Sequence, residues 1–209
     1  MQNTPQITTA NAILTLQNER GKTTKQDLRI TVYEWQNKEK IVYSKEIKGV
    51  SLNKGMNELK IPISAPEAKL WSVDDPNLYV CEVELSEGKN WVDKDSRRFG
   101  FRWFEASGIG EDAVFRLNGK RIMLRSAISW SFWPVNGIFP SEELAERQIR
   151  IAKELGLNML NFHRFIGNTD VMNYADELGL LYFEEPGGFR LDVRQPFMNA
   201  VLHEKVVRM

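Results

Sequence analysis

Apolar and polar residues alternate with a period of two through the first half of the 209-residue chain. Leu28, Ile30 and Val32 alternate with polar neighbours, and Cys81 and Val83 belong to a second stretch of the same kind. This alternation turns one face inward and the other toward solvent, which predicts half-buried antiparallel strands. The predicted strands cover residues 12–18, 28–33, 40–47, 57–63, 79–85 and 91–101, with turn residues between them.

The number and spacing of these strands indicate a β-sandwich. Six or seven short strands in about 100 residues are typical of the immunoglobulin-like architecture. The Cys–Trp–Cys spacing of antibody domains is missing, since Cys81 is the single cysteine. We therefore expect an immunoglobulin-like sandwich over residues 1–105, with Trp71 and Tyr79 in its core or at a corner.

After about residue 110 the pattern changes to strands that alternate with helices. Ser141 and Thr169 are the predicted helix caps, and Gly156 and Gly179 the predicted helix ends. The first helix carries apolar residues that we expect on one broad face. These are Leu144, Ala145, Ile149, Ile151, Ala152 and Leu155. The predicted strands are 120–129, 159–163 and 180–185, and the predicted helices 141–155, 169–178 and 196–209.

Strands that alternate with helices imply parallel pairing through right-handed crossovers. The third strand is mostly apolar, as expected for a strand buried on both faces. A complete (β/α)₈ barrel needs about 250 residues, so three units amount to less than half of one. Residues 106–209 are therefore expected to form either an interrupted TIM barrel or a small complete α/β domain.

Composition and charge narrow the function classes. Lys plus Arg and Asp plus Glu both number 28, so the formal net charge is zero, which removes the electrostatic argument for nucleic acid or an anionic membrane. A single cysteine excludes an internal disulfide and a multi-cysteine metal site, and the two histidines, His163 and His203, have no ligand spacing. Residues 1–10 lack the basic and apolar regions of a signal peptide, and the compartment stays open.

Five motifs occur in an order and spacing that resemble one enzyme family. They are Leu70-Trp-Ser-Val-Asp-Asp-Pro-Asn-Leu-Tyr79, Arg98-Phe-Gly-Phe-Arg102, Phe115-Arg-Leu-Asn-Gly-Lys-Arg-Ile-Met-Leu-Arg125, Lys153-Glu-Leu-Gly-Leu-Asn-Met-Leu-Asn-Phe-His163 and Asp176-Glu-Leu-Gly-Leu-Leu-Tyr-Phe-Glu-Glu-Pro186. Together they resemble glycoside hydrolase family 2, which includes β-galactosidases, β-glucuronidases and β-mannosidases. The resemblance covers residues 12–209.

This resemblance implies a multi-domain parent enzyme that hydrolyses O-glycosyl bonds of β-linked sugars with retention, using two glutamates and no cofactor. It also implies a β-domain before residue 1 and the rest of the barrel after residue 209 as partners of this segment. The family's acid/base and nucleophilic glutamates come after the fourth barrel strand and later, so neither is present. By the resemblance the chain is expected to be an inactive fragment, from a parent that is often periplasmic or secreted.

Three departures from the family pattern fall where substrate contacts are expected. Ser126 stands where the family has Gly, residues 128–130 replace an Asn-x-His, and residues 161–163 replace an Arg-x-Ser-His stretch. All lie at or near the carboxyl ends of predicted barrel strands, where barrel enzymes bind substrate. The galactose, glucuronate or mannose specificity of family members therefore cannot be assigned to this chain.

The candidate substrate-binding residues are His163, Arg164, Glu185, Trp130 and Trp133. His163 matches the family's substrate-contacting histidine, with a hydrogen-bonded strand-end histidine as the alternative. Arg164 is suited equally to a sugar hydroxyl and to a structural ion pair. The Trp130 and Trp133 rings suit the apolar face of a sugar, but could equally pin their loop or contact another domain. Glu185 is expected to help shape the pocket floor.

Glu184 and Glu185 are not expected to be the catalytic pair. A glycosidase needs two carboxylates across one bond, about 5–5.5 Å apart for retention and 6.5–9.5 Å for inversion. Neighbours on a strand point to opposite faces, so these two cannot flank one bond.

Two alternatives stay open. One is a non-catalytic sandwich module that binds carbohydrate or another protein, and the other is an independent α/β domain of unrelated activity. Unpaired barrel strands would also make the chain prone to self-association.

Overall fold

The computed structural model describes residues 8–88, 90–110 and 113–185. Within it the chain forms two compact units, residues 1–120 and 121–209, which we treat separately. The expected boundary after residue 105 stays a prediction. The predicted helix over 196–209 lies outside the described residues.

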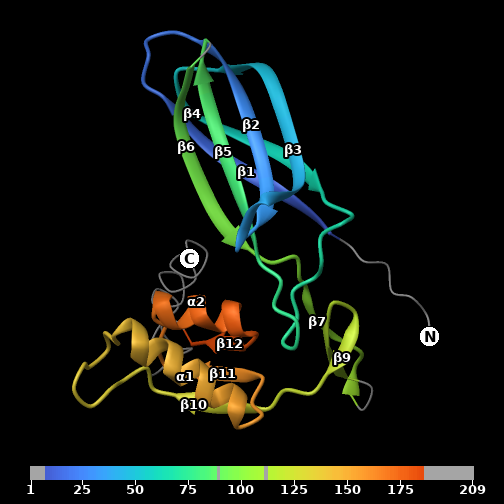
Figure 1. The fold of residues 1–209 in the computed structure, drawn as a ribbon, viewed down its shortest axis with the longest axis vertical. Helices are drawn as coiled ribbons and strands as arrows, with labels where there is room; N and C mark the ends of the chain where they lie inside the picture. The colour runs from blue at the N-terminus through green and yellow to red at the C-terminus, as the bar shows by residue number, and fades with distance from the viewer. Residues whose placement is uncertain (1–7, 89, 111–112, 186–209) are drawn as a thin grey trace, which may run out of the picture. The chain divides into compact units, whose positions relative to one another are not determined.

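Residues 9–99 of the first unit form two antiparallel sheets (Figure 1). The smaller sheet pairs β1 with β4, and the larger has the order β3-β2-β5-β6. The strands are β1 (Thr9–Asn18), β2 (Thr24–Glu34), β3 (Asn37–Leu52), β4 (Gly55–Ser64), β5 (Tyr79–Glu87) and β6 (Asn90–Phe99). Each of the six strands predicted from the alternation is present, and the prediction of a β-rich first half is confirmed.

One hydrophobic core lies between the two sheets. Leu28, Ile30 and Val32 of β2 are fully buried, and they pack with Ile61 and Ile63 of β4. Their polar neighbours point to the other face, as a period of two requires. The two sheets therefore form a two-layer sandwich.

Trp71 and Tyr79 are core residues, as predicted. The side chains are 0% and 1% exposed, and the Tyr79 hydroxyl accepts a hydrogen bond from the backbone N–H of Lys69 at 2.7 Å. That bond gives the one polar atom of the buried ring a partner, which burial of a tyrosine requires. A Cβ at Gly100 would lie 2.8 Å from the Trp71 Cβ, so only glycine fits there.

The predicted strand over 120–129 is two strands in two different sheets. β9 (Lys120–Ile122) belongs to a small sheet with β7 (Phe104–Ser107) and β8 (Val114–Leu117), whereas β10 (Ser126–Ser129) pairs with β11 (Met159–Phe162). Asn158 holds the chain between them: its side chain donates to the carbonyl of Met123 and accepts from the N–H of Arg125. The prediction of one strand was wrong because this change of sheet depends on a residue more than 30 positions away.

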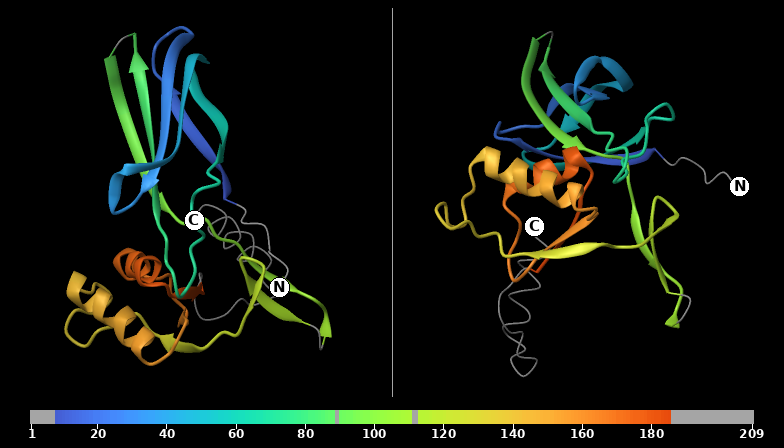
Figure 2. Two further views of the ribbon diagram at one scale, coloured as in Figure 1. Left: turned by 45° about the vertical axis from the view of Figure 1, so that its right-hand side comes forward. Right: turned by 60° about the horizontal axis from the view of Figure 1, so that its bottom comes forward.

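The second unit is a three-stranded parallel sheet with two helices on one face (Figure 2). The order is β10-β11-β12, with β12 at Leu181–Glu184, and α1 (Glu142–Glu154) and α2 (Thr169–Leu178) are the crossovers. Ala145 and Ile149 of α1 and Val171 of α2 pack on Leu160 and Phe162 of β11. The predicted parallel pairing is confirmed.

Two details of the helices differ from prediction. The cap of α2 is Asn168, which accepts from the N–H of Asp170 at 2.9 Å, and Thr169 is the first helical residue. On α1, Ile151 and Leu155 are exposed (41% and 73%), because a helix turns about 100° per residue and Ile151 points away from Ile149. The predicted caps Ser141 and Gly179 are confirmed.

The sheet face opposite the helices is open among the described residues. Ile128 of β10, Asn161 of β11 and Phe183 of β12 share this face in register, and Ile128 and Phe183 are 61% and 54% exposed. The prediction that 180–185 is buried on both faces therefore does not hold within the described chain. No described helix has the length and apolar character needed to cross a membrane.

Candidate functional site

The carboxyl ends of the three parallel strands bring three predicted site residues into one row. Ser129, Phe162 and Glu184 are in register at the ends of β10, β11 and β12. Trp130, His163 and Glu185 follow them directly in the sequence. The backbone N–H of His163 also donates to the Ser129 carbonyl at 3.0 Å, which extends the ladder beyond the strands. We call Trp130, His163 and Glu185 the edge cluster.

His163 links the members of the edge cluster. Its Nδ1 lies 3.3 Å from Glu185 Oε2, and its ring meets the Trp130 ring edge to face, with centroids 4.6 Å apart. A neutral histidine that donates through Nδ1 carries its acceptor lone pair on Nε2. The arrangement therefore orients the imidazole and defines which nitrogen can accept from a ligand.

Glu185 is held as a carboxylate. The backbone N–H of Arg164 donates to Glu185 Oε2 at 3.1 Å. This bond, helped by the side chains of Asn161 and His163 and opposed by partial burial, holds the pKa of Glu185 below its ordinary value. A charged carboxylate accepts strong hydrogen bonds from hydroxyl groups, which is the chemistry a sugar offers.

Arg164 enters this geometry through its backbone. Its φ of +58° is in the left-handed region, unusual for a residue other than glycine. That conformation accompanies the bond from its N–H to Glu185. A sugar contact by the guanidinium stays a prediction.

Glu184 and Glu185 have different partners, as the strand geometry requires. Glu184 Oε1 accepts from the backbone N–H of Gly167 at 2.9 Å, on the far side of the loop that begins at His163. Gly167 itself is tightly packed, because an added Cβ would lie 2.7 Å from the Phe162 ring. Both glutamates therefore shape the loop 163–167 from its two sides.

The two candidate tryptophans behave differently. Trp130 is 61% exposed beside His163, so one part of its ring is available to a ligand. Trp133 packs against the helix-covered core, and its backbone pairs with that of Gly137. This packing favours the loop-pinning role for Trp133, and a sugar contact by it stays a prediction.

Asn161 adjoins the edge cluster but was not among the predicted site residues. It lies two positions before His163, on the open face of the sheet, and its side chain hydrogen-bonds Glu185. The period of two along β11 would have placed it beside His163.

Ser129 was also not among the predicted site residues. Its hydroxyl accepts hydrogen bonds from the side chain of Gln148 at 2.7 Å and from the backbone N–H of Ser131 at 3.2 Å, which fixes the start of the loop after β10.

The described residues contain no group of three or more His, Cys, Asp or Glu side chains arranged for a metal ion. Cys81 is half-buried in the sandwich, and burial raises the pKa of its thiol. A thiol of raised pKa is a weak nucleophile at neutral pH. The edge cluster, in contrast, offers an exposed aromatic ring, an oriented imidazole and a carboxylate at one place.

Comparison with known proteins gives matches to one family. Residues 1–102 match the model of glycosyl hydrolases family 2. A putative beta-glucuronidase of Formosa agariphila is 34% identical over 117 residues, which are 56% of this chain and 14% of that protein. A Beta-galactosidase of Thermoanaerobacterium thermosulfurigenes is 34% identical over 125 residues, 59% of this chain and 17% of that protein. The chain thus spans less than a fifth of these relatives.

Solved structures match over more of the chain. A glycosyl hydrolase family 2 member from Bacteroides cellulosilyticus DSM 14838 is 26% identical with a TM-score of 0.74, covering 87% of this chain and 24% of that one. A beta-glucuronidase of Bacteroides uniformis, 23% identical with a TM-score of 0.71 over 87% of this chain and 21% of that one, supports the fold alone.

Proposed function

Residues 1–102 belong to glycosyl hydrolases family 2, and on that premise we propose that the chain is a segment of a glycoside hydrolase acting on β-linked sugars. The first unit is its immunoglobulin-like domain, and the second is the start of its (β/α)₈ barrel. The 87% coverage by a family 2 structure supports both assignments, because that match extends past residue 120 into the parallel sheet. Relatives named beta-galactosidase and beta-glucuronidase support a β-glycosidase activity in the whole protein.

The edge cluster is the observation that carries this proposal. Barrel enzymes bind substrate at the carboxyl ends of their strands, and here three consecutive strands each end on a candidate sugar contact. The exposed Trp130 ring suits the C–H face of a sugar, while His163 Nε2 and the Glu185 carboxylate suit its hydroxyl groups. We propose that the cluster holds one sugar ring of the substrate.

Sugar binding by the 209-residue chain tests the cluster. We expect methyl β-D-galactopyranoside or phenyl β-D-glucuronide to give saturation-transfer NMR signals with the chain. Trp130→Ala and His163→Ala should each reduce the affinity by about tenfold or more, because each removes a direct contact. The matched control is Trp91→Ala, which removes an aromatic residue of β6, 37% exposed, outside the cluster. Equal losses in all three variants would count against the cluster as the sugar site.

The isolated chain is expected not to hydrolyse glycosides. Hydrolysis needs two carboxylates across one bond, and Glu184 and Glu185 are instead bound to the backbone of Gly167 and Arg164. Nitrophenol release from aryl β-glycosides should therefore equal the buffer rate, both for the chain and for Glu185→Gln. Release that falls in Glu185→Gln would contradict this assignment.

The alternative function is a non-catalytic carbohydrate-binding or interaction module. The coding sequence beyond Met209 discriminates between the two. A continuing reading frame that reaches an Asn-Glu pair after a fourth barrel strand supports the hydrolase, while a stop codon there supports the module.

A further inference from the structure

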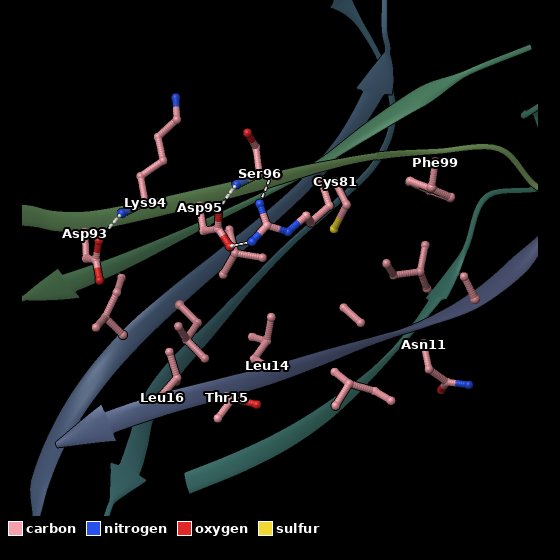
Figure 3. Close-up of a pocket in the computed structure, with 18 residues that line it drawn as sticks. Asn11, Leu14, Thr15, Leu16, Cys81, Asp93, Lys94, Asp95, Ser96 and Phe99 are labelled. Carbon is pink, nitrogen blue, oxygen red and sulfur yellow. Dashed lines mark hydrogen bonds and ion pairs between the residues drawn. The ribbon is translucent and has the colours of Figure 1, made fainter. Parts of the chain in front are cut away.

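A groove of about 730 Å³ lies beside β1 in the first unit (Figure 3). Its walls are largely aliphatic, and its charged residues are of both signs: Asp93, Lys94, Asp95 and Arg97. Asp95 already pairs with Arg97 at 3.3 Å. The groove therefore selects no ligand by charge, in contrast to the polar groups around the edge cluster of the second unit.

Two members of the edge cluster are each followed by a residue in the left-handed region. Ser131 follows Trp130 and has a φ of +48°. Arg164 follows His163 and has a φ of +58°. Only one other non-glycine residue of the described chain has such a φ. The conformation is unfavourable for a residue with a side chain and persists where neighbouring groups hold it, as Glu185 does at Arg164.

The hydroxyl of Ser129 holds the turn at Ser131. The backbone N–H of Ser131 donates to Ser129 Oγ at 3.2 Å. The side chain of Ser131 does not contribute, because it is buried and its own hydroxyl has no hydrogen-bond partner among the described residues. Ser129 is itself buried, which strengthens the bond because solvent competes less for it.

Gln148 of α1 fixes the position of the Ser129 hydroxyl. Its Nε2 donates to Ser129 Oγ at 2.7 Å. Its Oε1 is buried and has no hydrogen-bond partner within the described ranges, which is unfavourable for stability. A methionine of similar length would avoid this unpaired oxygen. Stability alone therefore does not explain a glutamine at this position.

Ser129 also connects the turn to His163. Its carbonyl accepts from the backbone N–H of His163 at 3.0 Å, so one residue positions the backbone beside both rings of the cluster. The Trp130 and His163 rings meet edge to face, with 4.6 Å between centroids and 81° between planes. Trp130 is 61% exposed, so other side chains enclose little of its ring. The orientation of the ring therefore depends on its backbone and on its contact with His163.

We propose that Gln148 is a positioning residue of the edge cluster. It holds the left-handed turn at Ser131 through the Ser129 hydroxyl. This turn sets the Trp130 ring against His163. The ring orientation follows from these contacts, whereas its consequence for sugar affinity rests on the proposed function. The competing explanation is that Gln148 only attaches α1 to the sheet, and the two explanations predict different results.

The ring current of Trp130 gives a readout that needs no sugar. It shifts the imidazole resonances of His163, and the difference between the parent 209-residue chain and Trp130→Ala measures this shift by NMR at about pH 9, above the range in which histidines titrate. We expect Gln148→Met to lose most of the shift. The matched control is Arg147→Met, the same substitution at an exposed neighbouring position of α1, and it should keep the shift. An unchanged shift in Gln148→Met would overturn the proposal.

Two further variants separate positioning from attachment of the helix. Ser129→Ala should lose the shift as Gln148→Met does, and the double variant should lose no more, because both changes act on one hydroxyl. Ser131→Gly should restore much of the shift to Gln148→Met, because glycine adopts a left-handed φ without strain. Hydrogen exchange of α1 amides shows that each variant is folded. Additive losses, or no recovery with Ser131→Gly, would support attachment alone and overturn the proposal.

Sugar affinity connects the positioning role to the proposed function. Gln148→Met should weaken binding of methyl β-D-galactopyranoside or phenyl β-D-glucuronide about threefold, the order of the cost of immobilising one side chain, and Arg147→Met should leave it unchanged. A parent chain that binds neither sugar would contradict the proposed function, while the ring-current results still decide the role of Gln148. Parent-like affinity in a Gln148→Met variant that has lost the ring-current shift would refute a role for Gln148 in sugar binding.

Discussion

At the scale of single residues, Glu82 is a buried carboxylate on the outer face of the larger sheet. It is 8% exposed, and Lys94 Nζ, Lys38 Nζ and the Tyr33 hydroxyl lie 2.7, 3.2 and 3.3 Å from its Oε2. The hydrogen bond from Lys94 is the main reason why the pKa of Glu82 is lowered, with Lys38 adding to it and burial opposing it. The folded state therefore favours the charged form of Glu82.

This predicts a pH-dependent contribution to stability. A folded-state pKa below the unfolded value means that the contribution is complete above pH 4.5, the ordinary pKa of the group, and is lost as the pH falls through the folded value. Glu82→Gln should lower the free energy of unfolding by about 1–2 kcal/mol at pH 7. The difference from the parent should shrink as the pH falls from about 5 to 3.

Hydrogen exchange of β2 and β5 amides in urea measures this effect within the first unit. Glu58→Gln, on an exposed position of β4, is the matched control and should change little at either pH. A Glu82→Gln penalty that stays constant down to pH 3 would refute the charge-based explanation.

The edge cluster could be predicted from the sequence because its members are recognised by residue type and position. Trp130, His163 and Glu185 were each selected by motif or by position after a strand, and the register of β10, β11 and β12 brings them together. The role of the Arg164 backbone was not accessible in the same way, because it depends on the left-handed conformation of Arg164. Nothing in a sequence specifies that turn when the residue is not glycine.

At the scale of elements, the two helices test how well caps can be located. Asn168 caps α2, and its backbone is extended, with φ −63° and ψ 138°. Thr169 is the first residue of the helix. Both residues are good caps, so the sequence alone does not separate them. The choice follows from the position of the first helical residue.

The cap assignment predicts different costs for two neighbouring substitutions. Asn168→Ala should destabilise the second unit by about 1 kcal/mol, because the N–H of Asp170 loses its acceptor. Thr169→Ala, the matched control, should cost far less, because Ala has the higher helix propensity. Hydrogen exchange of α2 amides compares the two, and a larger loss in Thr169→Ala would reverse the assignment.

The positions of the strands were predicted better than the sheets to which the strands belong. Alternation located β1 to β6 because each has one buried face, which is a local property. The division of 120–129 into β9 and β10 depends on Asn158, which binds Met123 and Arg125 from the turn after α1. Periodicity does not encode a contact of that separation.

At the scale of the whole molecule, the chain combines a two-layer sandwich with a three-stranded parallel sheet that two helices cover on one face. Both units have a face or edge that the described residues leave open: the groove beside β1, and the sheet face with Ile128 and Phe183. The chain also spans only 14% and 17% of two relatives. The open surfaces are thus compatible with a segment that functions within a larger protein, as proposed above.

We propose that the ends of β10, β11 and β12 form a sugar site. The most direct measurement follows the imidazole resonances of His163 by NMR, assigned with His163→Gln, while methyl β-D-galactopyranoside and phenyl β-D-glucuronide are titrated into the 209-residue chain. We expect a saturable shift of the His163 resonances with at least one of the two sugars, and the loss of this shift in Trp130→Ala. Sugar binding that leaves the His163 resonances unchanged, or no binding of either sugar, would rule out a sugar site at these strand ends.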